Sequence, residues 1–455
     1  MSDMTIKEKS VVETEITAVT NEGAGVSRCG GMVLFTPFTV VGDTAKVKIV
    51  KVGKTCLYGE LVEVTKPSPE RIEPDCPSFG ECGGCTFRHM TYEAEKEQKT
   101  AWVEDHIRRI GGFNLSPFPV KPSPQKTRYR NKAIYQVGKT AEGKIVFGFY
   151  KRKSHEIVDG ESCLLQPEIF SKILSAVRFF IEQNRISIYD EETNRGLFRA
   201  VYLRQGEVSG EIGVCLVLNG EKLPSTELLV SVLSTNFPQI VSIVLNVNKE
   251  RTNVVLGKEF RTIYGKDGIT DVLCGVTVDL SPAAFYQVNH GAAELLYGIA
   301  AEYAALSGTE TVLDLYCGAG TIGLSMAKNA GKLIGVEIVP EAIENARKNA
   351  ERMGVHKAEF LCGDAAKAAE TLRKRGLRPN VIILDPPRKG CSEETLAAVA
   401  SMAPDRIVMV SCNTATMARD FKILASFGYQ PQKVQPVDLF PRTANCEAVA
   451  LLTKE

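Results

Sequence analysis

The sequence predicts an α/β chain in three parts: an N-terminal β-barrel, a mixed α/β central region and a C-terminal Rossmann-like sheet. Short strand-like stretches separated by turns fill residues 11–64, which is typical of a small barrel. From residue 309 onward, apolar strands alternate with helices, and this alternation indicates a parallel, doubly wound sheet. A length of 455 residues allows roughly two to four domains. We expect boundaries at 10–67, 68–270 and 271–455.

The composition is that of a folded globular protein, with 44% hydrophobic and 24% charged residues. No apolar run approaches the ~18 residues that a membrane span needs, and the N-terminus lacks an apolar signal core. We therefore expect a cytoplasmic protein without a membrane partner. Thirteen cysteines in such a chain favour metal-binding or catalytic thiols over disulfides. The net charge of +1 does not by itself indicate a nucleic-acid partner.

The N-terminal barrel is predicted from four strand-like stretches at residues 13–19, 31–37, 44–52 and 58–64. About five short strands in such a length suit a closed barrel of the OB type, which often binds oligonucleotides. A barrel that only packs against its neighbour is the alternative.

A cysteine cluster follows a proline-rich linker at residues 67–77. Cys76, Cys82 and Cys85 form a C-x5-C-x2-C pattern, and Cys163 lies far downstream in GESCLLQP. Three clustered ligands and one remote ligand favour a [4Fe–4S] site over zinc, which usually takes two close C-x2-C pairs. Zinc and no metal remain the alternatives. Four protein thiolates leave no free iron position, so a cluster here would be structural or RNA-orienting.

The central region combines a helix with a basic segment. We expect a helix at residues 93–111 that packs on the C-terminal domain. Residues 121–153 contain ten lysines and arginines but one glutamate, with five interleaved aromatic residues. This pattern favours phosphate contact and base stacking, although a solvated charged face would look the same.

The C-terminal part opens with a glycine turn. Gly318, Gly320 and Gly323 spell G-x-G-x-x-G, and Glu337 closes the next strand. This fingerprint also occurs in nicotinamide enzymes. Asp314 before the turn favours an ammonium-bearing ligand such as S-adenosylmethionine, because an acid does not suit a pyrophosphate. The Asp-Pro-Pro sequence that begins at Asp385 resembles the D/N-P-P loop of methyltransferases that act on nucleobases.

One thiol lies between a buried strand and a helix. Four apolar residues at 407–410 lead into Ser-Cys-Asn, and a helix is expected at 415–426 with Asn413 or Thr414 as its cap. This places Cys412 past the carboxyl end of a strand, where reactive groups of α/β sheets lie. The N–H groups of the helix are expected to favour its thiolate. By itself, the segment favours an inert, half-buried cysteine, because free cysteines are usually buried and unreactive.

As a whole, the chain resembles the TRAM-containing, S-adenosylmethionine-dependent 23S rRNA (uracil-5-)-methyltransferases, RNA 5-methyluridine enzymes with an iron–sulfur cluster. The resemblance covers roughly residues 11–452. Its motifs occur in the family's order: the TRAM stretch AVTNEGAGVSRCGGMVLF, CPSFGECGGC with Cys163, SPAAFYQVN, DLYCGAGTIGL, DPPRKG, VSCN and FPRTANCE.

The resemblance implies how these residues act. Uracil carbon 5 is a poor nucleophile, but addition of a thiolate at carbon 6 makes an enolate that attacks a methyl sulfonium. Cys412 would be this nucleophile, and Glu447 the base that removes the carbon-5 proton. The implied cofactors are S-adenosylmethionine and a [4Fe–4S] cluster on the four cysteines. The implied methyl-donor site contains six residues: Gln287, Tyr316, Glu337, Asp385, Thr321 and Asp364.

The expected partner is RNA, with the target uridine flipped out of a loop, and the expected oligomeric state is a monomer. The barrel and the cysteine cluster favour 23S rRNA over tRNA, because similar tRNA enzymes lack both. Alternatives are a tRNA uracil-5-methyltransferase, a non-catalytic RNA-binding or assembly factor, and a nicotinamide oxidoreductase.

The sequence departs from the family at Asn445, where many relatives have histidine. Cys391 and Cys446 near the site leave a two-thiol cytosine mechanism formally open, and Cys317 is expected to be a packing residue.

Overall fold

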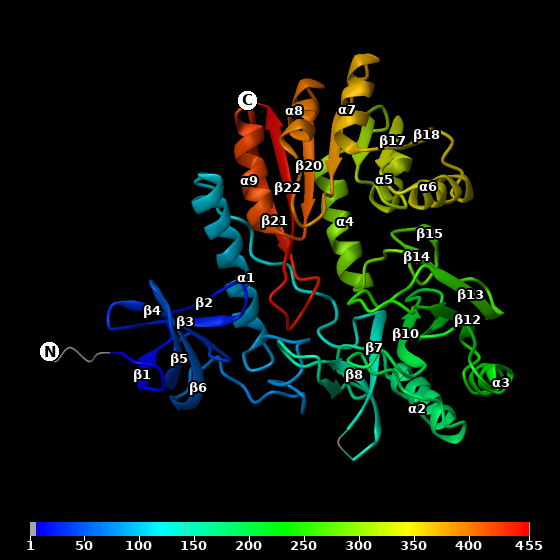
Figure 1. Cartoon of the computed structure of the whole chain (residues 1–455). Coiled ribbons are helices and arrows are strands. Elements are labelled where there is room, and N and C mark those ends of the chain that lie inside the picture. The colour runs from blue at the N-terminus through cyan, green and yellow to red at the C-terminus, as the bar shows by residue number, and fades with distance from the viewer. Residues whose placement is uncertain (1–5, 141, 455) are drawn as a thin grey trace.

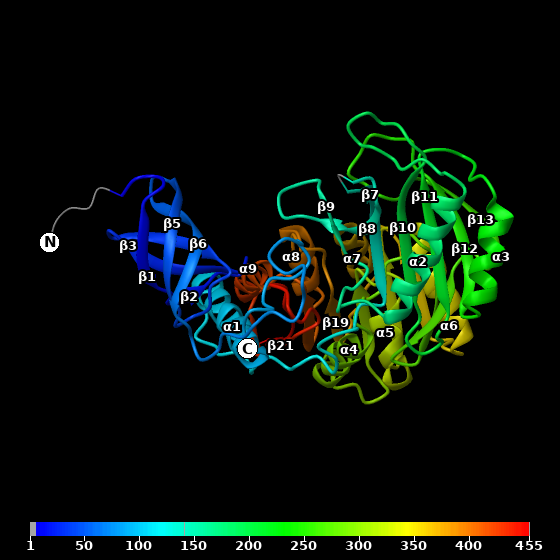
Figure 2. The same ribbon diagram turned by 90° about the horizontal axis from the view of Figure 1, so that it is seen from below.

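The computed structural model describes residues 6–140 and 142–454. Figure 1 shows the N-terminal barrel in blue at one side, the central sheet in cyan and green below, and the C-terminal sheet with its helices above. Seen from below, the barrel and the central sheet lie on opposite sides of the helices α8 and α9 (Figure 2). Helix α1 (Tyr92–His106) runs from the barrel along the C-terminal sheet.

The barrel contains six strands in the order β1-β5-β6-β4-β3-β2. Their bounds are β1 (Val11–Glu15), β2 (Ala18–Val19), β3 (Ala24–Cys29), β4 (Met32–Pro37), β5 (Thr44–Val52) and β6 (Cys56–Lys66). Strand β5 matches the predicted range, whereas the expected strand at 13–19 is divided into β1 and β2, and β3 was not predicted. Alternate residues of β5, among them Val47 and Ile49, are fully buried in the barrel core, as expected for a strand with one covered face.

The central region is one seven-stranded sheet in the order β13-β12-β11-β10-β7-β8-β9. Its elements are β7 (Lys132–Lys139), β8 (Ile145–Tyr150), β9 (Ile157–Asp159), α2 (Glu168–Gln183), β10 (Phe198–Gln205), β11 (Ile212–Leu218), α3 (Thr226–Asn236), β12 (Ile240–Val247) and β13 (Glu259–Gly265). Helix α2 buries Phe170, Ile173 and Val177 against the sheet, because residues three and four apart share one helix face.

The C-terminal sheet has the order β18-β17-β16-β19-β20-β22-β21. Its elements, with the hairpin before them, are β14 (Ile269–Leu273), β15 (Val276–Leu280), α4 (His290–Ala304), β16 (Thr311–Leu315), α5 (Thr321–Met326), the short 3-10 turn η2 (Ala327–Asn329), β17 (Lys332–Glu337), α6 (Pro340–Arg352), β18 (Ala358–Cys362), α7 (Ala365–Lys374), β19 (Val381–Leu384), α8 (Glu393–Ser401), β20 (Arg406–Ser411), α9 (Thr414–Ala425), β21 (Tyr429–Val437) and β22 (Glu447–Lys454).

The expectation of a wholly parallel sheet is wrong at its last two strands. Strand β22 runs antiparallel to β20, and β21 runs antiparallel to β22. Strand β21 was not predicted, because Pro431 and Pro436 interrupt its sequence. As the outermost strand it tolerates prolines, which lack the N–H that a central strand needs on both sides.

Helix α1 belongs to the core of the C-terminal sheet although it is encoded before the central sheet. A π-helical turn (Ile107–Gly111) extends it. Val103 and Ile107 are fully buried in the same apolar cluster as Ile407, Met409 and other residues on one face of that sheet. The helix therefore joins the N-terminal half of the chain to the C-terminal sheet.

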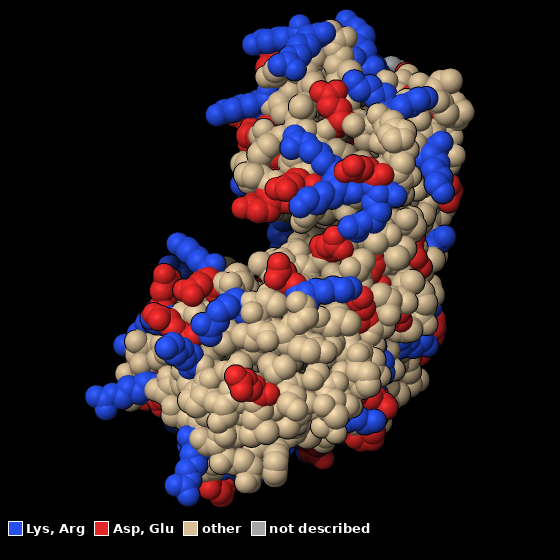
Figure 3. All heavy atoms as spheres, turned by 90° about the vertical axis from the view of Figure 1, so that its right-hand side faces the viewer, with Lys and Arg blue, Asp and Glu red and all other residues tan. Residues whose placement is uncertain are grey.

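The outer face of the central and C-terminal regions is hollowed between an upper and a lower lobe (Figure 3). Lysine and arginine side chains on this face are interspersed with acidic ones, and much of the lower lobe is uncharged. Among the described residues, no helix has the length and apolar character that crossing a membrane requires.

Candidate active site

The predicted reactive residues meet at one edge of the C-terminal sheet. Asp385 follows β19 and Cys412 follows β20, so both lie at the carboxyl ends of neighbouring parallel strands. Glu447 begins β22, which is antiparallel to β20, and the last pair between these two strands is Ser411–Ala448. The antiparallel direction of β22 therefore brings a residue from the far end of the chain to the same edge.

Cys412 lies at the start of helix α9, as predicted. The Asn413 side chain accepts hydrogen bonds from the N–H groups of Ala415 (3.1 Å) and Thr416 (3.4 Å). Asn413 is thus the cap, and the helix covers Thr414–Ala425 rather than residues 415–426.

The environment of Cys412 does not favour its thiolate in the resting protein. Burial raises the pKa of Cys412, and the carboxylates of Glu447 and Asp385 raise it further. Arg388 and a backbone N–H lower it, but by less. The backbone effect expected at the helix start is present, but burial and the two acids that the fold brings near outweigh it.

Glu447 and Asp385 titrate near neutral pH. Glu447 is buried, and this burial, assisted by Asp385, raises its pKa to about 8 against the opposing effect of Arg388. Burial raises the pKa of Asp385 to about 7. A carboxyl group with such a pKa can both accept and return a proton at neutral pH, which is what general acid–base chemistry needs.

Arg388 was not predicted as a site residue. It follows the Asp-Pro-Pro sequence, and its guanidinium lowers the pKa of both Cys412 and Glu447. Its carbonyl accepts hydrogen bonds from the Asn413 side-chain amide at 3.0 Å and the Thr416 hydroxyl at 3.3 Å. The arginine in the motif DPPRKG could have identified it from the sequence, since a cation balances the charge of two nearby acids and a thiolate.

A cavity of about 180 Å³ opens beside Cys412. Its wall includes Arg388 and Asn445, Trp102 and His106 from α1, and Asn21 from the barrel. None of the last three was predicted at the site. The helix was expected to pack on the C-terminal domain, and its core contacts with that sheet agree with this, but the sequence did not show that it and a barrel turn would lie beside Cys412.

Helix α1 is anchored on both sides of this cavity. The Trp102 indole N–H donates to the Val19 carbonyl of the barrel at 2.8 Å. The His106 Nδ1 lies 2.8 Å from the Thr414 hydroxyl at the start of α9. The cavity is therefore built from the barrel, α1 and the C-terminal sheet together.

The glycine turn after β16 is held by two acids. Glu337 accepts hydrogen bonds from the N–H groups of Gly318 (3.2 Å), Ile338 (2.8 Å) and Val339 (2.9 Å). Asp314 is buried beneath the turn and accepts from the Gly323 N–H at 3.0 Å.

One carboxylate oxygen of Asp314 could accept a hydrogen bond from a ligand. Burial, with smaller effects of Asp385 and Glu337, raises its pKa to about 8. Its buried Oδ1 has no hydrogen-bond partner among the residues that the structure describes. An ammonium group would satisfy this acceptor and favour the ionised carboxylate, so the residues present fit an ammonium-bearing ligand.

The remaining predicted cofactor residues surround this turn. Tyr316 adopts a positive φ of 66°, which is uncommon for a tyrosine and typical of functional turns. The Tyr297 hydroxyl contacts the side chains of Thr321 (3.4 Å) and Gln287. Asp364 is exposed and caps α7 by accepting from the Lys367 N–H at 3.1 Å.

The four predicted metal-ligating cysteines lie near one another. Each of Cys82, Cys85 and Cys163 has its pKa raised mainly by burial, and other thiols of the set raise it further. The buried Arg88 donates to the Cys85 sulfur at 3.4 Å. However, in residues 6–140 and 142–454 no three Cys, His, Asp or Glu side chains form a metal-binding group. The structure therefore does not confirm an iron–sulfur site, because proximity in this loop falls short of ligating geometry.

The basic segment at residues 121–153 has partly structural roles. Arg128 donates to the carbonyls of Cys163 (2.8 Å) and Gln166 (2.9 Å). Burial lowers the pKa of Lys132 to about 8, assisted by Arg204 and Arg130. Five lysines of the segment are exposed and free of such burial: Lys121, Lys126, Lys139, Lys144 and Lys153.

The other thiols near the site are held protonated. Burial raises the pKa of Cys391 and of Cys446 to about 12. Cys317 is buried in the apolar core beneath the glycine turn. Cys412 is the thiol that follows β20 at the sheet edge where Asp385 and Glu447 lie.

Two segments of the chain match known domain families. Residues 7–62 match the TRAM domain, and residues 306–411 match a methyltransferase domain. An uncharacterized RNA methyltransferase of Halalkalibacterium halodurans is 42% identical over 450 residues, covering 98% of each chain. Another, from Bacillus cereus, is 40% identical over 450 residues, covering 99% of this chain and 98% of its own.

A solved structure covers nearly the whole chain. The crystal structure of Pyrococcus abyssi tRNA (uracil-54, C5)-methyltransferase in complex with S-adenosyl-L-homocysteine superposes with a TM-score of 0.78 at 28% identity. It covers 97% of this chain and 100% of its own. A chain with a barrel of the TRAM family, a methyltransferase domain and full-length relatives at this identity belongs to the TRAM-containing RNA methyltransferases.

Proposed function

We propose that the protein transfers a methyl group from S-adenosylmethionine to carbon 5 of a uridine in RNA. The observation that carries this proposal is the meeting of Cys412, Glu447 and Asp385 at one sheet edge, beside the glycine turn. A thiol beside a buried acid of near-neutral pKa is the pair that activation of uracil carbon 5 needs. The resemblance in the motifs VSCN and FPRTANCE supports the same roles.

In the proposed reaction, the Cys412 thiol first gives its proton to solvent. The thiolate then bonds to carbon 6, which opens the double bond between carbons 5 and 6 and makes carbon 5 nucleophilic. Carbon 5 then takes the methyl group, and S-adenosylhomocysteine is the leaving product. Glu447 removes the proton from carbon 5, the sulfur–carbon 6 bond breaks, and the Cys412 thiolate is restored. Arg388 favours the charged forms of both side chains, which offsets part of the cost of ionising them in a buried site.

The methyl donor is proposed to bind at the glycine turn. The Oδ1 atom of Asp314 would accept from its ammonium group, and Glu337 would hold its ribose hydroxyls. The other proposed contacts are Gln287, Tyr316, Asp385, Thr321 and Asp364. When bound, the donor supplies an electrophilic methyl sulfonium.

We propose 23S rRNA as the substrate only because the motifs resemble the 23S rRNA methyltransferases, and tRNA is the second candidate. The argument that a similar tRNA enzyme would lack the N-terminal parts is wrong, because the Pyrococcus abyssi tRNA enzyme aligns over 97% of this chain. Support for a folded RNA partner comes from the TRAM match and from the cavity between barrel and sheet. A flipped uridine can reach Cys412 only after leaving its stack.

The decisive test uses RNA that contains 5-fluorouridine. After methyl transfer, carbon 5 carries fluorine in place of hydrogen, so Glu447 has no proton to remove. The Cys412 adduct should therefore persist and be visible as a protein–RNA band. The variant Cys412→Ala should lose the band, while the control Cys446→Ala, on the same cavity wall, should keep it. An adduct with Cys412→Ala would contradict the proposal, and absence of S-adenosylhomocysteine binding would instead indicate a non-catalytic RNA-binding factor.

The choice of RNA is tested separately. Purified 23S rRNA and tRNA from a strain that lacks the gene are incubated with the enzyme and labelled donor, and the modified nucleotides are mapped by mass spectrometry. Incorporation into 23S rRNA supports the first candidate, and incorporation into tRNA alone supports the second.

We also propose Cys76, Cys82, Cys85 and Cys163 as ligands of a [4Fe–4S] cluster. Their mutual proximity and the Arg88 hydrogen bond support the proposal, since a cation stabilises thiolates. Anaerobic purification, iron and sulfide analysis and visible absorption provide the test. The variant Cys82→Ser should lose the iron, whereas the distant control Cys215→Ser should keep it. Zinc in place of iron would contradict the proposal.

A further inference from the structure

The connection between β21 and β22, residues 438–446, ends at Glu447 and is held from outside the C-terminal sheet. Four consecutive carbonyls accept hydrogen bonds from side chains or N–H groups of four other segments. Leu439 accepts from Asn289, Phe440 from Lys99, Pro441 from Tyr129, and Arg442 from the N–H of Thr86. This connection is hereafter the base loop.

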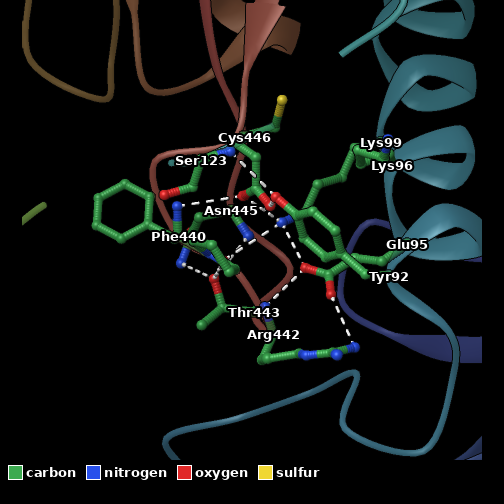
Figure 4. Close-up of polar contacts among 12 residues, drawn as sticks. Tyr92, Glu95, Lys96, Lys99, Ser123, Phe440, Arg442, Thr443, Asn445 and Cys446 are labelled. Carbon is green, nitrogen blue, oxygen red and sulfur yellow. Dashed lines mark hydrogen bonds and ion pairs between the residues drawn. The ribbon is translucent and has the colours of Figure 1, made fainter. Parts of the chain in front are cut away.

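Lys99 of α1 lies at the centre of this arrangement and is fully buried (Figure 4). Its ammonium group contacts Glu95 Oε1 at 2.8 Å, Asp438 Oδ1 at 2.7 Å and the Phe440 carbonyl at 3.3 Å. The Tyr92 hydroxyl donates to the other oxygen of Asp438 at 2.8 Å. One helix side chain thereby joins two acids and the backbone of the base loop.

The second acid contacts the base loop directly. The Arg442 N–H donates to Glu95 Oε1 at 2.7 Å, and its guanidinium lies 3.6 Å from Glu95 Oε2. Arg442 also adopts a positive φ of 69°, a conformation that neighbouring contacts must impose. Buried ion pairs contribute little net stability, so a fixed geometry is the better explanation for such a cluster.

A chain of hydrogen bonds leads from Lys99 to the cation of the active site. The Thr443 hydroxyl donates to the same Phe440 carbonyl at 2.8 Å. It accepts from the backbone N–H of Asn445 at 3.3 Å and from its side-chain amide at 3.4 Å. The Arg388 guanidinium donates to the Asn445 side-chain oxygen at 3.3 Å. Asn445 thus contacts both Thr443 and Arg388.

We propose that Lys99 is a positioning residue that, through the base loop, holds Arg388 toward Cys412 and Glu447. The proposal rests on the proposed roles of Cys412 and Glu447. The groups that face these two are each other, Asp385 and Arg388, with His106 across the cavity. The groups that face Lys99 are Glu95, Asp438 and Cys446, and Arg442 lies beside Glu95.

The deciding variant is Thr443→Val. It removes the hydroxyl that links the Phe440 carbonyl to Asn445, and it removes no buried charge. We expect kcat to fall about 2- to 30-fold, the range of energetic coupling through such networks. The KM for RNA and the affinity for S-adenosylhomocysteine should stay within about twofold, because neither site loses a contact. The pH at which adduct formation with 5-fluorouridine RNA is half-maximal should rise, since Arg388 no longer lowers the pKa of Cys412.

Lys99 itself is tested with a charge-retaining and a charge-removing change. Lys99→Arg should retain more activity than Lys99→Met, and the control Lys96→Met should be unaffected. Lys96 is on the same helix but pairs with the exposed Glu93. Wild-type kcat and pH profile in Thr443→Val would overturn the proposal, whether or not Lys99→Met folds.

The two proposals fail in different ways. If the wild-type protein forms no adduct with 5-fluorouridine RNA, the proposed function is wrong. If the wild-type protein forms the adduct and Thr443→Val forms it at the same rate at every pH, only the positioning role is wrong.

Discussion

Cys412 and Glu447 lie one residue beyond the last pair of the ladder between β20 and β22, in which Ser411 faces Ala448. The thiol ends a parallel strand and the acid begins an antiparallel one, so the sheet itself brings them together. Each of the two strands has a neighbour on both sides, and both are mostly buried. The following expectations rest on this arrangement.

Glu447→Gln should trap the covalent intermediate on ordinary uridine RNA. The amide cannot take the carbon-5 proton, so methylated RNA should accumulate on Cys412 while turnover falls about 10²- to 10⁴-fold. Denaturing gel electrophoresis with labelled donor measures this. Free methylated RNA at the wild-type rate would contradict the assignment of Glu447 as the base.

The same variant should be more stable than the wild type at alkaline pH. The pKa of Glu447 is raised from 4.5 to about 8, so the folded protein binds its proton more tightly than the unfolded chain. The stability from this proton is fully present below pH 4.5 and is lost as pH rises through 8. Urea unfolding should therefore show equal free energies near pH 4.5 and a higher value for Glu447→Gln above pH 8.

Product release should accelerate with pH. Below pH 8, the fraction of Glu447 that is ionised falls about tenfold for each pH unit. The single-turnover rate of release should rise with this slope and level off near pH 8. A rate that is independent of pH from 6 to 8 would show that another group removes the proton.

Asp314→Asn should weaken the binding of S-adenosylhomocysteine. The amide keeps the size of the side chain but lacks the charge that a ligand ammonium would meet at Oδ1. Loss of a charge-assisted hydrogen bond should raise the dissociation constant about 10- to 100-fold, as measured by calorimetry. Glu359→Gln, at an exposed acid paired with Lys332, is the control and should bind normally.

Trp102→Phe should loosen the barrel from α1. The Val19 carbonyl would lose its donor inside a buried contact, at a cost of about 1–3 kcal/mol. We expect a higher KM for RNA with little change in the affinity for S-adenosylhomocysteine, since the cavity is partly walled by Trp102 and the glycine turn is remote from it. Unchanged KM together with lowered thermal stability would show that this contact is structural only.

Local features of the fold were predictable from the sequence. The strand at 44–52, the cap at Asn413 and the glycine turn follow from residue types at fixed spacing, and the structure has them in place. Strand β21 was missed because its prolines argue against a strand unless its position at the sheet edge is known. The domain boundaries at residues 67 and 270 stay predictions.

The active site was predictable only in part, because its electrostatics depend on contacts between distant segments. The helix N-terminus beside Cys412 was expected to favour its thiolate, yet burial, followed by Glu447 and Asp385, raises the pKa of the thiol. Asn21, Trp102 and His106 reach the cavity only through the packing of α1 on the C-terminal sheet.

The contact between Lys99 and Asp438 joins residues 339 positions apart. During synthesis, helix α1 leaves the ribosome long before its partner in the base loop exists, and the barrel is complete earlier still. Closure of this contact is therefore among the last events of folding, and contacts of such high sequence separation form slowly. A chain that lacks residues 447–454 would lack the acid beside Cys412 and the strand that pairs with β20. The proposed active site is thus complete only when α1 and the base loop have been brought together.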